Sequence, residues 1–111
     1  MRSAHIRDII SKLLQASSSP GFYSLTEKDL SYCGVVKFLE IIGEAAYKLT
    51  NEFKESHAET PWKLVIAMRH VLVYGYYQIN REEVFKAIRE NLPILKGQIE
   101  QYISESLKQD N

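Results

Sequence analysis

The residues best suited to chemistry are gathered in one short stretch that joins an arginine, a histidine and three tyrosines. Arg69 and His70 stand together among apolar residues, and Tyr74, Tyr76 and Tyr77 follow them around a glycine. A guanidinium can grip a phosphate, an imidazole can move a proton near neutral pH, and a phenol can donate a hydrogen bond. Such groups converging at a helix end would form a phosphate or nucleotide site. The residue types alone leave a second interpretation open, in which the arginine lies at a helix-packing seam and the tyrosines cap the core.

The spacing within this stretch decides which side chains can share a helix face. Arg69 and Tyr76 are seven residues apart, so they would lie on one face if the helix continues. His70 and Tyr74 are four apart and would lie on another face. The chemistry of the stretch therefore depends on the elements that position it.

Those elements are predicted by apolar residues at helical spacing. The periodic segments are separated by breaks such as Ser17–Gly21, and no alternation of period two is long enough for a sheet. We expect helices, in chain order, over residues 4–16, 27–55, 61–74, 81–91 and 92–107. Because amphipathic helices must bury their apolar faces against one another, we expect an all-α fold, an up-down bundle of four to five helices in a single domain over residues 1–111.

Polar residues mark the expected helix starts. Thr26 with Asp29 resembles a capping box before the long second helix. Thr60 is expected to be the N-cap of the third helix, with Pro61 at its first helical position. Asn80, followed three residues later by a glutamate, has the same capping pattern before the fourth.

Small residues inside the second helix carry two further expectations. Gly34 and Gly43 each cost up to ~1 kcal/mol relative to alanine, and a close helix contact at Gly43 would explain its tolerance. Cys33, the single cysteine, lies in an apolar run and is expected to be a buried small side chain rather than a reactive thiol.

The composition bounds the class of protein. Lys plus Arg and Asp plus Glu number 14 each, so the formal net charge is zero, and nothing in the bulk charge suggests a duplex-DNA partner. A local basic site for RNA stays open. No apolar run approaches the ~18 residues that span a bilayer, and no secretory stretch follows the N-terminus. We therefore expect a cytoplasmic protein that binds neither membrane nor DNA.

Other catalytic and metal-binding patterns are missing from the sequence. It contains no Gly-rich phosphate loop, no His-Glu-x-x-His and no Cys-x-x-Cys. His5, His57 and His70 are far apart and lack acidic partners at ligand spacing, so we expect no metal site and no cofactor. Glu40 and Glu44 lie one helical turn apart, a pattern more typical of a solvated helix face than of acid–base catalysis.

Four motifs in order resemble one known family. Residues 39–46 contain Ile-Gly-Glu-Ala-Ala, residues 60–62 are Thr-Pro-Trp, residues 68–73 fit Met-Arg-x-x-Leu-Val, and residues 92–96 fit Leu-Pro-x-Leu-Lys. Over residues 35–95 the sequence resembles the HepT-like branch of the HEPN superfamily, the toxin partners of minimal nucleotidyltransferase antitoxins.

The resemblance implies a metal-independent RNA endonuclease whose two protomers line one cleft. The family's site motif is Arg-x4-His-x-Tyr, with a polar residue after the arginine. Arg69 supplies the arginine that would hold the scissile phosphate, His70 the polar residue and Tyr76 the terminal tyrosine. Tyr74 stands at the histidine position. Because an unperturbed tyrosine has a pKa of ~10 against ~6.5 for histidine, we expect weakened activity, with His70 as the nearest substitute imidazole.

The resemblance also implies regulation by a partner. The nucleotidyltransferase antitoxin would transfer AMP onto Tyr76, and Tyr74 is a second acceptor. The added phosphate would place negative charge beside Arg69, where RNA phosphate would bind. Two alternatives to a ribonuclease stay open: a non-catalytic module that binds a nucleotide, RNA or the nucleotidyltransferase, and a purely structural helical protein.

Overall fold

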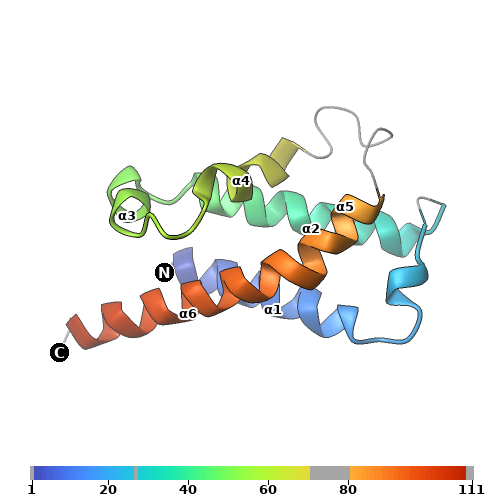
Figure 1. Cartoon of the computed structure of the whole chain (residues 1–111), viewed down its shortest axis with the longest axis horizontal. Helices are drawn as coiled ribbons and strands as arrows, with labels where there is room; N and C mark the ends of the chain where they lie inside the picture. The colour runs from blue at the N-terminus through green and yellow to red at the C-terminus, as the bar shows by residue number, and fades with distance from the viewer. Residues whose placement is uncertain (1, 27, 71–80, 110–111) are drawn as a thin grey trace.

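The computed structural model describes residues 2–26, 28–70 and 81–109. The regular elements, in chain order, are α1 (Arg2–Ser17), η1 (Phe22–Ser24), α2 (Leu30–Tyr47), α3 (Asn51–Ser56), α4 (Trp62–Ala67), η2 (Met68–His70), α5 (Arg81–Lys86), η4 (Ala87–Asn91) and α6 (Leu92–Gln109). All of these elements are helical. The chain runs along the bundle in α1, returns in α2, runs forward in α4 and returns through α5 and α6 (Figure 1). This confirms the expected all-α, up-down bundle.

The core lies where α1, α2 and α6 meet. α1 packs against both α2 and α6, and α2 also packs against α4 and η2. Buried apolar side chains recur three or four positions apart in each long helix. They are Ile6, Ile9, Ile10 and Leu13 of α1, Val35, Val36, Leu39, Ile42 and Ala46 of α2, and Leu92, Leu95, Ile99, Tyr102 and Ile103 of α6. α2 is thus held on one side by the core and presents its other side to α4 and η2.

The start of the second helix differs from the expected residue 27. The Thr26 backbone N–H donates to the Asp29 carboxylate over 2.8 Å, which is the return bond of a capping box. Asp29 itself has extended backbone angles (φ −90°, ψ 134°), so the pair closes a turn and the helix begins at Leu30. The predicted contact is present, but it precedes the helix instead of lying within it.

The predicted end of the second helix is also wrong, because the structure has two helices where the sequence predicts one. α2 ends at Tyr47, and α3 begins at Asn51, after three intervening residues. The Thr50 hydroxyl accepts a hydrogen bond from the Phe53 N–H over 3.1 Å and so caps α3. Leu49, between the two helices, is only 7% exposed. The apolar pattern therefore continues across a break that periodicity does not reveal.

Cys33 is exposed, which contradicts the expected burial. The buried face of α2 is set by Tyr32, Val35 and Val36, followed by Leu39. Cys33 is rotated by about 100° around the helix axis from Tyr32, which carries it off this buried face. An apolar run in sequence is thus not a buried run in the helix.

Thr60 has a role other than the expected N-cap. α4 begins at Trp62 and no side chain caps it. Thr60 is 2% exposed, and its hydroxyl donates to Gln98 Oε1 over 2.9 Å. The same oxygen lies 2.5 Å from the Tyr102 hydroxyl, which donates to it because the threonine proton is already used. The loop before α4 is therefore fastened to α6, and burial raises the pKa of Tyr102 above its ordinary value.

Thr60→Val is expected to lower the free energy of unfolding by ~1–3 kcal/mol, because it leaves the buried Tyr102 hydroxyl and the Gln98 carbonyl without their partner. Thr60→Ser keeps the hydroxyl and is the matched control, expected to retain most of the stability. Urea unfolding followed by circular dichroism measures both. A valine variant as stable as the wild type would show that the contact with α6 contributes nothing.

The third helix is shorter than expected. It ends as α4 at Ala67 and tightens into the 3₁₀ turn η2 over Met68–His70. The expected continuation to Tyr74 and the expected cap at Asn80 lie outside the described residues. η2 therefore contains Arg69 and His70, the part of the site motif that the structure describes.

The expected restart at Leu92–Pro93 is wrong, because the helix continues. The five residues Ala87–Asn91 form a π-helix that joins α5 directly to α6. A proline lacks the N–H of the helical ladder, and its ring crowds the carbonyl four residues earlier. A wider π turn just before Pro93 relieves that crowding. One long helical rod thus faces α1 on one side and α4 on the other (Figure 1).

Candidate functional site

The candidate site begins where the backbone of η2 meets α2. A methyl group built on Gly43 would overlap the backbone nitrogen of Arg69 and lie 3.0 Å from the carbonyl oxygen of Ile66. Only a residue without Cβ allows this approach. The predicted close contact at Gly43 is confirmed, and its partner is the turn that contains Arg69.

The approach places the Arg69 guanidinium beside two side chains of α2. Its Cζ atom lies 3.7 Å from the centroid of the Tyr47 ring, a cation–π contact. One of its terminal nitrogens lies 4.0 Å from a carboxylate oxygen of Glu44. Glu44 and Tyr47 are three residues apart, so they occupy one face of α2. Arg69 is thus held by contacts on two sides.

The Arg69 guanidinium is exposed enough to contact a ligand. The Arg69 side chain keeps 26% of its accessible surface and the Glu44 side chain 47%. An ion pair this exposed is worth little for stability, about 0–1 kcal/mol. A partly desolvated guanidinium with a fixed orientation binds planar anions, phosphate among them, through paired hydrogen bonds. The arrangement is therefore better suited to anion binding than to holding the fold together.

The other predicted site residues are not placed with Arg69. His70 ends η2, and its side chain is not described. Tyr74, Tyr76 and Tyr77 fall in residues 71–80, outside the described residues. The structure thus brings together Arg69 and α2, and the roles of the remaining motif residues stay predictions.

Two residues at the site were not predicted from the sequence. Glu44 was assigned to a solvated face with Glu40, yet only Glu44 pairs with Arg69, whereas Glu40 accepts a hydrogen bond from Lys37 over 3.3 Å. The signal was its position directly after Gly43, the point of closest approach. Tyr47 had no comparable signal, because nothing in the sequence shows which helix crosses α2 there.

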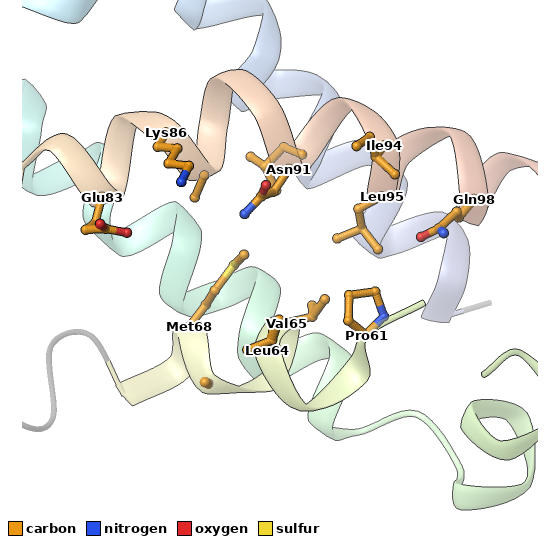
Figure 2. Close-up of a pocket in the computed structure, with 13 residues that line it drawn as sticks. Pro61, Leu64, Val65, Met68, Glu83, Lys86, Asn91, Ile94, Leu95 and Gln98 are labelled. Atoms are coloured by element: carbon orange, nitrogen blue, oxygen red, sulfur yellow. The ribbon is translucent and has the colours of Figure 1, made fainter. Parts of the chain in front are cut away.

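An apolar cavity of about 540 Å³ lies on the other side of α4, between it and the α5–α6 rod. In Figure 2 Met68, Val65 and Leu64 come from the α4–η2 side, facing Lys86 and Asn91 from the rod. Most of the lining is apolar, and Asn91 is one of a few polar side chains and extends from the rod toward α4 (Figure 2), so the cavity is shaped for binding.

Within residues 2–26, 28–70 and 81–109, no three His, Cys, Asp or Glu side chains lie close enough together to bind a metal ion. His57 points its Nδ1 atom at the Phe53 carbonyl oxygen, 2.8 Å away, and its ring packs 4.1 Å from that of Tyr102.

No helix within the described ranges is long and apolar enough to cross a membrane.

The bundle and its oriented arginine define a small all-helical domain with a candidate anion site. Residues 6–102 match the family described as Ribonuclease HepT-like, and the chain belongs to this family. The resemblance inferred from the four motifs is thereby confirmed.

Curated relatives agree with the family. The chain is 39% identical over 66 residues to the "Probable ribonuclease HepT" of Thermococcus cleftensis, which covers 60% of each chain. It is 37% identical over 68 residues to a "Putative RNase" of Caldanaerobacter subterraneus subsp. tengcongensis, covering 61% of each. A third, from Methanocaldococcus jannaschii and described in the same words, is 35% identical over 66 residues, or 60% of this chain and 61% of its own. The matched part thus spans about three fifths of these relatives' length, and no solved structure matches the chain.

Proposed function

We propose that the chain is a metal-independent RNA endonuclease in which Arg69 holds the scissile phosphate. The observation behind this proposal is the guanidinium fixed between Glu44 and Tyr47, in a chain that belongs to the Ribonuclease HepT-like family. A fixed cation at the phosphate stabilises the negative charge that develops in the transition state. Tyr74 stands at the position of the motif histidine, so the proposed cleavage is slow.

The proposal includes a homodimer and a regulatory partner. Two copies would line one cleft with both motifs, and a minimal nucleotidyltransferase antitoxin would add AMP to Tyr76. The chain would then be the toxin of a toxin–antitoxin pair. Adenylylated Tyr76 would compete with RNA for Arg69, because both present a phosphate. Mass spectrometry after incubation with a minimal nucleotidyltransferase and ATP tests this: a tyrosine mass shift that Tyr76→Phe abolishes is expected.

A second candidate function is a binding module without chemistry. Tyr74 favours it, since a phenol is a weak proton carrier at neutral pH. In this case the wild type binds RNA or a nucleotide through Arg69 and releases no cleaved product at any protein concentration.

Arg69→Ala is expected to reduce the rate of RNA cleavage by about 10²–10³, the usual effect of removing one group that stabilises transition-state charge. Arg69→Lys keeps the charge but loses the planar fork, so its rate should fall between the two. The assay follows a labelled single-stranded RNA with purified full-length protein in EDTA, with circular dichroism to confirm folding. Equal rates for wild type and Arg69→Ala would remove Arg69 from the site.

A further inference from the structure

The ring of Tyr47 is an exposed aromatic surface next to the proposed phosphate site. Tyr47 is the last residue of α2 and is 51% exposed. Within the described part of the chain its ring belongs to none of the ring–ring contacts, whereas Tyr23 and Tyr102 each pack on other rings. The core therefore does not need an aromatic residue here.

Two cations lie within 6 Å of the centre of this ring. The Arg69 guanidinium lies 3.7 Å from the ring centroid, and the Lys54 ammonium lies 5.9 Å from it. Lys54 also donates to the Tyr47 carbonyl oxygen over 3.4 Å, which holds α3 against the end of α2. Lys48, the next residue along the chain, is exposed. An aromatic ring between cations is the pattern by which proteins bind single-stranded nucleic acid, with bases on the ring and phosphates on the cations.

We propose that Tyr47 stacks a nucleobase of single-stranded RNA adjacent to the phosphate that Arg69 holds. This rests on the proposed function and specifies its substrate: an unpaired nucleotide whose base is free to leave the stack. Because the guanidinium lies so close to the ring, the phosphate and the base of neighbouring nucleotides can be held together. Every base has a π-face, so the contact favours unpaired RNA over duplex and is tolerant of sequence.

A purely positioning role for Tyr47 makes a different prediction. If the ring only orients Arg69, its removal weakens binding to any phosphate backbone, with or without bases. If it stacks a base, its effect depends on that base being present. A thermodynamic cycle between the ring and the base separates the two.

The cycle uses full-length protein and 2′-O-methyl oligonucleotides, whose blocked 2′-hydroxyl prevents metal-independent cleavage. One series contains a single abasic site moved along the strand. In wild type, one abasic position is expected to weaken binding about tenfold, or ~1.4 kcal/mol. Tyr47→Leu is expected to weaken binding of the intact strand by the same factor and to abolish the abasic effect. Tyr47→Phe keeps the ring and should behave as wild type.

Three results would overturn the inference. They are an intact strand bound equally by wild type and Tyr47→Leu, an abasic effect that persists in Tyr47→Leu, and equal weakening of intact and abasic strands. In each case Arg69→Ala can still abolish cleavage, so the proposed function survives. Absence of any RNA binding or cleavage by the wild type would instead reject both.

Discussion

Tyr74→His is expected to raise the rate of RNA cleavage by about 10²–10⁴, the usual contribution of a positioned acid–base group. The substitution restores the Arg-x4-His-x-Tyr motif in a chain that belongs to the Ribonuclease HepT-like family. An imidazole with a pKa of ~6.5 exchanges protons near neutral pH, whereas a phenol with a pKa of ~10 stays protonated. Initial rates on a labelled single-stranded RNA across pH 5–9 measure the gain (about the range in which histidine titrates).

The matched control is Tyr74→Phe, which removes the hydroxyl without adding an imidazole. It should cleave no faster than wild type. The Tyr74→His profile should bend near the pKa of histidine, and that of wild type should not. A histidine variant with the wild-type rate at every pH would mean that proton transfer does not occur at position 74.

Gly43→Ala is expected to lower the free energy of unfolding by ~1–3 kcal/mol, although alanine is the better helix former. The added methyl would meet the backbone of η2 at Arg69 and that of α4 at Ile66. Backbone atoms cannot rotate out of the way as a flexible side chain can, so α2 and η2 must separate. The same displacement moves Arg69 away from Glu44 and Tyr47, and cleavage should fall with stability.

Gly34→Ala is a matched control in the same helix. A Cβ built on Gly34 has no atom within 4 Å. Only the helix propensity then acts, and the free energy of unfolding should rise by up to ~1 kcal/mol. Thermal and urea unfolding followed by circular dichroism compare the pair. Two changes of the same sign would contradict the close approach at Gly43.

The helices that carry a regular apolar stripe could be predicted from the sequence. The stripes of α1 and α6 are regular, so both helices and most of their buried residues could be predicted. Contacts between residues far apart in the sequence could not be predicted in this way. The local context of Thr60 favours an N-cap, but its partner Tyr102 lies 42 residues later. The π turn before Pro93 was missed for a related reason, since packing of the rod against α1 outweighs the local preference for a break.

The site could be predicted in part. The motif gave Arg69, and the cost of a glycine within a helix indicated a close contact at Gly43. Glu44 and Tyr47 could not be paired with Arg69, because the helix that crosses α2 is fixed only by tertiary packing. Residues 71–80, with Tyr74 and Tyr76, remain assigned by sequence and family alone.

Arg69 and the side chain at position 74 are proposed to act on one phosphate. The most direct test is the RNA cleavage rate of the double variant Arg69→Ala with Tyr74→His, at matched folded concentration. If both belong to one site, the gain from histidine disappears when the guanidinium is absent, and the double variant cleaves no faster than Arg69→Ala alone. A double variant as fast as Tyr74→His would contradict the claim.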